Sequence, residues 1–562
     1  MPALQVTPGR RLIRRIPVRV RHHWKLLAGC VAFGLVLTVV FSTVRVQPYV
    51  TSSSDVSSDE VTQDIAGTRD LFDPTVAHDI SLTFRDADYQ RMLDTYAKEG
   101  EKEYVEASLT IDGTRIASVG VRLKGNSTLG GLTRDGESIG GLGGRRGGPG
   151  GPADGNGRPA DGPPGGVLAP GGVQAQSGGA PDAGAGNPRT GGGRARMALK
   201  AEEPETLPWL IRFDEFVDGR RYQGHREIAV RVGGIGGGST VLNEAVSLRV
   251  LHGLGESAPR YAYASFQVND RPATVRLVVE HPGENLADSL GGSGVLYKSL
   301  ATSQFTDQGD DPIDYQDDFN QVTKKGSQDL QPVIDLLKWV QHSSDAEFDA
   351  ELAGHVDVES FARYVALQNL LLNFDDMAGP GRNYYLWYDL KTKKFTVVGW
   401  DYNLTFSGNA AQGPHDASSI SFPGGGLPAG MQLPGGVKPP AGMQLPEGMQ
   451  LPGGVSPPDG EAGAGNGGER AGGPRGGMGS HKLKDRFLTS AKFKPVYEDA
   501  YRKLYHEVYV NGTASKALED LTRVLGSIDG HDAKAIASEA EQLRTLIQQR
   551  TARLADNEVV KG

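Results

Sequence analysis

The spacing of apolar residues predicts a chain that mixes strands with helices. Short apolar stretches, several with apolar residues at every second position, have the length of half-buried strands. We expect strands at 78–84, 105–111, 118–124, 222–232, 261–269, 273–280, 384–388 and 394–400. Helical spacing predicts helices at 86–96, 241–255, 331–343 and 358–374, and a helical tail over 481–557. This mixture indicates an α+β fold.

Two long segments break the pattern. Residues 130–196 consist mostly of Gly, Pro, Ala and Arg, and residues 408–480 carry the short repeat GMQLP three times. Such segments cannot bury enough apolar surface to offset the entropy lost on ordering, so we expect two disordered insertions. The remaining chain, 73–129, 197–407 and 481–557, is long enough for one sizeable, two-lobed domain.

The N-terminal pattern is that of a membrane anchor. Residues 1–25 are strongly basic, and Leu26 to Val44 run without a charge, about long enough for a helix to cross a bilayer. Basic residues before a span stay in the cytoplasm, so we expect a single-pass protein of the cell membrane. Its catalytic domain would then be extracellular, behind a polar stalk at 45–72. A cleaved signal peptide shares this order, but no small-residue cleavage site follows Phe41.

Composition and motifs exclude several classes of protein. The net charge of -9 gives no reason to expect a nucleic-acid partner. Cys30 is the single cysteine, so an intramolecular disulfide and a cysteine-rich zinc site are both excluded. The chain has neither GxSxG nor HExxH, which argues against common hydrolases.

Acidic and amide residues stand at the ends of apolar segments between residues 373 and 406. Asp375, or its neighbour Asp376, follows a predicted helix; Asn383 precedes a strand, and Asp401 follows the next strand. A protein kinase arranges its catalytic base and metal ligands in a similar order, and Mg²⁺ prefers oxygen ligands. The alternative is that these residues only cap a helix and end a strand.

Other polar residues could bind phosphates. Glu280 ends a predicted strand and Lys298 lies in the apolar run GVLYKSL, so the two could form an acid–lysine pair that orients phosphates, or an exposed salt bridge. Lys124 precedes a Gly-Asn-Ser-Thr turn that could contact a phosphate or merely close a hairpin. The glycine-rich run at 231–240 lacks a nucleotide-loop spacing and a Walker lysine, so a flexible connector is the better interpretation.

These segments together resemble the spore coat CotH kinase-like family, atypical kinases of bacterial cell surfaces and spores. The likeness covers about residues 75–128 and 200–406, and continues into the helical tail. Its segments include HDISLTFRDADYQRML, VGVRLKGNSTL, PWLIRFDEFVDGRRYQG and, most specific, NFDDMAGPGRNYYLWYDLKTKKFTVVGWDYNLTF. The chain departs from the family where Lys124 replaces a frequent arginine and GGIGGGST replaces an aspartate-bearing loop.

The resemblance implies a two-lobed kinase-like fold that binds ATP with Mg²⁺ or Mn²⁺. It makes Asp375 the catalytic acid, Asn383 its amide partner and a metal ligand, and Asp401 the metal-binding acid. Lys298 and Glu280 fall where the family has its lysine and acid. We therefore expect transfer of the γ-phosphate to Ser or Thr of a spore-coat or cell-envelope protein. An inactive surface scaffold and a different ATP-dependent transfer, such as nucleotidylation, remain alternatives.

Overall fold

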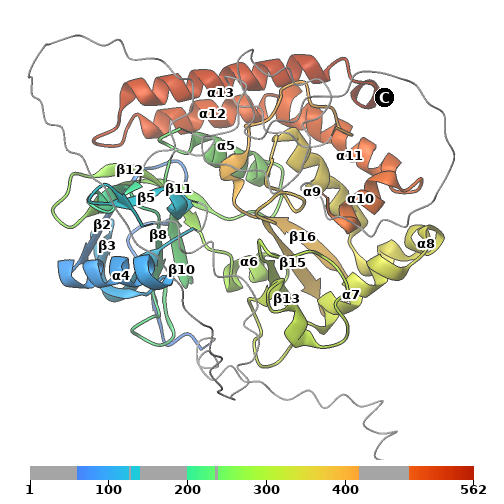
Figure 1. Ribbon diagram of the computed structural model, residues 1–562. Coiled ribbons are helices and arrows are strands. Elements are labelled where there is room, and N and C mark those ends of the chain that lie inside the picture. Colours follow the sequence, from blue (N-terminus) through green and yellow to red (C-terminus); the bar gives the residue numbers. More distant parts are fainter. Residues whose placement is uncertain (1–59, 126–127, 140–198, 234–237, 417–479) are drawn as a thin grey trace, which may run out of the picture. The chain divides into compact units, whose positions relative to one another are not determined.

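The computed structural model describes residues 60–125, 128–139, 199–233, 238–416 and 480–562 (Figure 1). They belong to one compact unit, Ser57–Gly562. None of their helices is long and apolar enough to cross a membrane. The expected span at 26–44 and most of the two expected insertions lie outside the described residues.

A closed barrel of seven strands forms the first half of the unit (Figure 1). In barrel order the strands are β10 (Glu227–Val230), β12 (Thr274–Glu280), β11 (Tyr261–Val268), β2 (His78–Phe84), β3 (Val105–Ile111), β4 (Thr114–Leu123) and β8 (Trp209–Arg212). The β3–β4 hairpin turns at Asp112 and Gly113, both with positive φ, as the Asp-Gly pair predicts. Helix α4 (Asp86–Glu99) follows β2 and buries Met92 and Leu93.

A second, four-stranded antiparallel sheet holds the segments around the candidate catalytic residues. Its order is β14 (Phe319–Gln321), β13 (Gly294–Ser299), β15 (Tyr384–Asp389) and β16 (Phe395–Gly399). There are two smaller sheets. One pairs β1 (Gln63–Ile65) with β9 (Arg220–Tyr222), and in the other β5 (Leu132–Arg134) lies between β6 (Glu137–Ser138) and β7 (Leu199–Lys200).

The helices are concentrated in the second half of the chain. They are α5 (Leu242–Gly253), α6 (Glu284–Ser289), α7 (Gln331–His342), α8 (Asp345–His355), α9 (Val358–Leu370), α10 (Lys482–Thr489), α11 (Lys494–Tyr505), α12 (Thr513–Leu525), α13 (Ala533–Leu554) and α14 (Glu558–Lys561). A π-helical turn, His506–Val510, follows α11. Helix α12 packs against both α5 and α13 (Figure 1).

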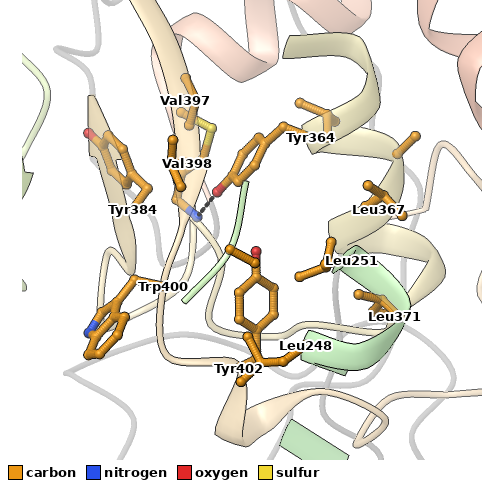
Figure 2. Close-up of a cluster of buried hydrophobic side chains, with 14 of the residues drawn as sticks. Leu248, Leu251, Tyr364, Leu367, Leu371, Tyr384, Val397, Val398, Trp400 and Tyr402 are labelled. Carbon is orange, nitrogen blue, oxygen red and sulfur yellow. Dashed lines mark hydrogen bonds between the residues drawn. The ribbon is translucent and has the colours of Figure 1, made fainter. Parts of the chain in front are cut away.

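Two separate apolar cores stabilise these parts. One core lies within the barrel, around Leu82, Leu109 and Trp209. The larger core joins α5, α9 and the four-stranded sheet to the C-terminal helices. Figure 2 shows side chains of α5 and α9 pointing toward those of β16, and the Tyr364 hydroxyl accepts a hydrogen bond of 3.3 Å from the Met377 amide. The second core therefore fixes the helix that precedes Asp375.

The structure corrects several expected boundaries. The expected strand at 222–232 is wrong, because Gln223 and Gly224 both have positive φ and form a turn that separates β9 from β10. The expected helix at 358–374 ends at Leu370. Ordered chain continues past residue 130, where we expected an insertion to begin, because Leu132–Arg134 pairs with two short strands. Helix α8, which begins with a capping box at Ser344, was not predicted.

Candidate active site

A pocket opens where one barrel wall approaches the segment that follows β16. It is lined by Lys124, Gly125, Thr128, Pro208, Val230, Arg231, Val232, Gly233, Asp401 and Asn403. Lys124 and Arg231 directly follow barrel strands β4 and β10, and Asp401 comes two residues after β16. The pocket thus brings together three segments that are far apart in the sequence.

Local backbone contacts fix these three residues. The Lys124 amide donates to the Pro208 carbonyl at 3.0 Å, and the Arg231 amide donates to the Leu277 carbonyl at 2.8 Å. Asp401 has a φ of 57°, which is uncommon for a residue with a side chain. This left-handed conformation turns the chain sharply after Trp400 and starts a short 3₁₀ helix.

Arg231 bridges two carboxylates. Its Nη2 donates to Glu244 Oε1 at 2.6 Å, and its Nη1 lies 2.9 Å from Asp401 Oδ1. The Trp400 ring contacts two cations: the Arg231 Cζ atom is 5.0 Å and the Lys124 Nζ atom 5.3 Å from its centre. A cation near an aromatic face is stabilised by the ring's negative face. Trp400 therefore helps to hold both cations at the pocket.

Burial and mutual repulsion alter the charges of this cluster. Burial lowers the pKa of Lys124 to about 7, and the neighbouring Arg231 lowers it further than Asp401 can restore. Burial also raises the pKa of Glu244, against the opposing effect of Arg231. Burial would raise the pKa of Asp401 too, but Arg231, Lys124 and Lys298 outweigh it and hold this pKa below its usual value. Of these two acids, Asp401 therefore has the lower pKa.

Asp375 lies in the loop between α9 and β15 and is held by its neighbours. Its Oδ2 accepts a hydrogen bond of 2.8 Å from Asn383 Nδ2, and its Oδ1 accepts one from the Gly381 amide. A Cβ at position 381 would lie 2.5 Å from Asp375 Oδ2, so this approach requires glycine. Burial raises the pKa of Asp375 to about 6, and the charges of Asp401 and Asp376 add to that effect. This carboxylate can therefore exchange a proton near neutral pH.

The three predicted central residues are connected in space. Asn383 contacts Asp375 through its side chain, and its carbonyl accepts a hydrogen bond of 3.2 Å from the Trp400 amide, next to Asp401. Asp376, the alternative candidate, instead forms an ion pair with Lys484 of α10 and is 2% exposed. The geometry therefore favours Asp375 over Asp376, because Asp375 is the one that contacts Asn383.

The donor atoms around Asp401 fit a hard divalent cation. Among the described residues no group of three or more His, Cys, Asp or Glu could hold a metal ion. However, three buried side-chain oxygens have no hydrogen-bond partner within the described chain, namely Asn243 Oδ1, Glu244 Oε2 and Asn403 Oδ1, and Asp401 Oδ1 has only its ion pair with Arg231. Carboxylate and amide oxygens are the ligands that Mg²⁺ and Mn²⁺ prefer. A metal held here would draw on Asp and Asn side chains rather than on acids alone.

A comparison with known families bears on this site. A family model described as CotH kinase protein matches residues 201–443. The resemblance to the CotH family is confirmed over this stretch. It suggests a kinase-like enzyme. A search of curated proteins finds no match.

The CotH match contains every expected site residue except Lys124, which precedes it. Lys124 lines the pocket, as a phosphate-contacting residue would. Lys298 lies on β13, and burial lowers its pKa while Asp401 and Glu227 oppose that shift. Both lysines are thus close enough to Asp401 to interact with its charge.

The expected Glu280–Lys298 pair is not among the ion pairs of the described residues. Glu280 Oε2 accepts a hydrogen bond of 3.0 Å from the Arg260 amide, and Oε1 lies 3.4 Å from His225 Nδ1. The carboxylate at the end of β12 is therefore engaged by groups other than Lys298. Within this CotH-like site, Glu227 rather than Glu280 is the acid that most supports Lys298 after Asp401.

Sequence reasoning missed Arg231 and Glu244. Arg231 begins the glycine-rich run and Glu244 lies in the helix that follows it, but the sequence pattern singles out neither residue. A signal was available: Glu244 is the acidic residue in the first turn of a helix whose early positions are otherwise uncharged. A buried acid of this kind requires a cation, and Arg231 is the basic residue at the end of the preceding strand.

Proposed function

We propose that this chain is a membrane-anchored atypical kinase that transfers the γ-phosphate of ATP to Ser or Thr of a cell-surface or spore-coat protein. The observation that carries the proposal is the connection of Asp375, Asn383 and Asp401 beside a pocket lined by Lys124 and Arg231. Phosphoryl transfer needs these parts: a base for the hydroxyl, oxygen ligands for a metal, and cations for the phosphates. The CotH match supports the same reaction class.

Each residue has a role in this proposal. Asp375, with a pKa raised to about 6, aligns the substrate hydroxyl and accepts its proton. Asn383 holds the Asp375 carboxylate in place. Asp401, Asn403 and Glu244 provide oxygens for Mg²⁺ or Mn²⁺, which when bound neutralises phosphate charge. Lys124, Lys298 and Arg231 bind the phosphates. In this proposal the two apolar cores correspond to the two lobes of a kinase.

One observation favours a second candidate, a scaffold without catalysis. Arg231 already neutralises Asp401 in this structure, at 2.9 Å. An acid that is permanently paired with arginine would not bind a metal. The scaffold would use the same fold to hold envelope or coat proteins at the membrane.

A labelling experiment separates these candidates. The purified full chain, in detergent, is incubated with Mg²⁺ or Mn²⁺, an envelope-protein extract and ATP labelled at the γ- or the α-phosphate. A kinase transfers only the γ-label, to itself or to extract proteins, and loses at least about 100-fold of this activity in Asp401→Ala and Asp375→Ala. The control is Asp345→Ala, because the Asp345 side chain is fully exposed and belongs to α8.

Each other result identifies an alternative. Equal labelling by wild type and Asp401→Ala, or none by either, contradicts the kinase proposal and leaves the scaffold. Transfer of the α-label identifies nucleotidylation. The anchor is tested separately: alkaline carbonate should leave the full chain in the membrane fraction, and N-terminal mass spectrometry should find residues 1–25 intact. Release by carbonate or a mature N-terminus beyond residue 44 contradicts anchoring by residues 26–44.

A further inference from the structure

Unsatisfied hydrogen-bonding groups of both kinds lie in the pocket or beside it. Among the acceptors, Asn403 Oδ1 in the pocket and Glu244 Oε2 of the acid behind Arg231 have no hydrogen-bond partner among the described residues, and Asp401 Oδ1 has only its ion pair with Arg231. The donor is Arg231 Nε, which is buried and likewise without a partner in that part of the chain. Buried polar groups without partners are costly, so both kinds of group favour a ligand that satisfies them. A ligand that carries a cation beside an anion satisfies both.

Arg231 occupies the position between the two carboxylates. Two different nitrogens of its guanidinium reach Glu244 Oε1 at 2.6 Å and Asp401 Oδ1 at 2.9 Å. The Asp401 contact is an ion pair that lacks the alignment of a hydrogen bond. Arg231 is 7% exposed and Glu244 is 1% exposed, so neither charge can be neutralised by bulk water. Arg231 therefore supplies the positive charge that pairs with both acids.

Arg231 hinders the entry of a bare metal ion. Lys124, Arg231 and Lys298 all act on the charge of Asp401, and Glu244 is the other acid in contact with Arg231. A divalent cation that entered alone would have to displace Arg231 from both carboxylates. Phosphate oxygens remove this obstacle, because they offer Arg231 and the lysines a new partner. The phosphates therefore draw Arg231 away from the two carboxylates, and the carboxylates then become available to the metal ion.

We propose that this pocket binds a divalent cation only together with the phosphates of a nucleotide, and that Arg231 enforces this by pairing with Asp401 and Glu244 in the free protein. The inference rests on the proposed function, and it adds a binding order to the same site. When the phosphates bind, the guanidinium turns to them and releases the two carboxylates. The free protein is thereby kept from binding divalent ions without nucleotide.

The test measures Mn²⁺ binding directly. Electron paramagnetic resonance counts free Mn²⁺ in the presence of the purified full chain, with and without a non-hydrolysable ATP analogue. A protein-free titration corrects for the Mn²⁺ that the analogue binds in solution. We expect Mn²⁺ to bind at least tenfold more tightly when the analogue is present. Because coupling between two ligands is reciprocal, Mn²⁺ should increase the affinity for the analogue by the same factor in equilibrium dialysis.

Variants of Arg231 identify the cause. Arg231→Met should allow Mn²⁺ to bind without nucleotide and reduce the coupling to less than threefold. Arg231→Lys keeps the charge but loses the planar fork that reaches both acids, so it should give an intermediate coupling. The control is Arg363→Met, which removes an arginine–glutamate pair of similar length, 2.5 Å to Glu256, away from the pocket. Its coupling should equal that of the wild type.

The outcomes distinguish this inference from the proposed function. If wild type binds Mn²⁺ equally well with and without the analogue, the binding order is wrong, although a kinase remains possible. If the analogue does not bind with or without Mn²⁺, the proposed kinase fails and the inference fails with it. If circular dichroism shows that Arg231→Met does not fold, the inference is tested by the coupling in the wild type and by its reduction in Arg231→Lys. Unchanged coupling in Arg231→Lys excludes the arginine fork as the cause.

Discussion

Asp375 combines burial with two nearby negative charges, and this combination sets its proton affinity. Burial raises its pKa to about 6, the charges of Asp401 and Asp376 add to the increase, and hydrogen bonds from Gly381 and Asn383 oppose it. A base works only when it is deprotonated, so activity should fall as the pH decreases through about 6. The rate constant kcat/KM should increase about tenfold between pH 5 and pH 7. The measurement is the pH profile of γ-phosphate transfer, with circular dichroism to verify folding at pH 5.

A variant of Asn383, the amide partner of Asp375, tests the assignment of Asp375 as the catalytic base. Asn383→Ala removes a hydrogen bond that favours the ionised carboxylate, so the pKa of Asp375 should increase. The decrease in the remaining activity should then occur at a higher pH than in wild type. A flat profile between pH 5 and pH 7, or a decrease at an unchanged pH in Asn383→Ala, would contradict the role of Asp375 as the base.

Residue type and order in the sequence predicted some residues of the site, but not which of its acidic and basic side chains form ion pairs. Asp375, Asn383 and Asp401 could be selected because acids and amides at the ends of apolar segments often carry chemistry. Arg231 and Glu244 could not be paired in the same way, because their contact depends on how β10 and α5 pack in three dimensions. Glu280 fails for the same reason: its neighbours His225 and Arg260 come from other segments. Contacts of this kind leave no local pattern in the sequence.

Among the elements, strands of regular alternation were the easiest to predict. β2, for example, starts and ends where the pattern His78 to Phe84 does, because its alternate residues face the barrel core. The turn at Gln223 was missed, because glutamine rarely adopts positive φ. Helix α8 was missed because only two of its residues, Phe348 and Leu352, are buried, which leaves a weak apolar pattern.

Helix α10 contacts the loop between α9 and β15, which carries Asp375, through an ion pair. Lys484 forms an ion pair with Asp376, whose side chain is 2% exposed, and Asp376 Oδ1 also accepts a 2.8 Å hydrogen bond from the Ala378 amide. Removal of the cation leaves a buried carboxylate without its partner. Lys484→Met should therefore lower the free energy of unfolding by about 3–5 kcal/mol. Urea denaturation of the purified full chain measures this change.

A double variant separates pairing from packing. Asp376→Asn in the Lys484→Met background removes the unpaired charge, so it should recover most of the lost stability. The control is Lys494→Met on α11, since the Lys494 amino group lies 3.9 Å from Glu498 and is half exposed. An exposed pair of this kind contributes at most about 0.5 kcal/mol. Equal losses in the two lysine variants would refute the proposed role of Lys484.

In the molecule as a whole, Glu539 of helix α13 forms hydrogen bonds with residues 239 and 240, which lie between the pocket residue Gly233 and helix α5. This carboxylate accepts hydrogen bonds from the backbone amides and the hydroxyls of both Ser239 and Thr240, about 300 residues earlier in the chain. Those two residues precede α5, whose first turn carries Glu244. Gly238 allows the approach, because a Cβ there would lie 2.3 Å from the Glu539 carboxyl carbon. A distant helix thus holds the acid that pairs with Arg231.

Loss of this contact should therefore loosen the pocket without unfolding the protein. In Glu539→Ala the amides of Ser239 and Thr240 lose their acceptor. The start of α5 is then held less firmly, so amides of residues 239–246 should exchange hydrogen several-fold faster, while those of β2 and β3 keep their rates. Binding of the ATP analogue should weaken by a similar factor, because Glu244 and Arg231 are no longer held in place. Hydrogen exchange with mass spectrometry measures the first effect and equilibrium dialysis the second. Glu541→Ala, which removes an exposed carboxylate from the same helix, serves as the control. If Glu539→Ala exchanges at the wild-type rate over 239–246, α13 does not stabilise this segment, and the pocket depends on the barrel and α5 alone.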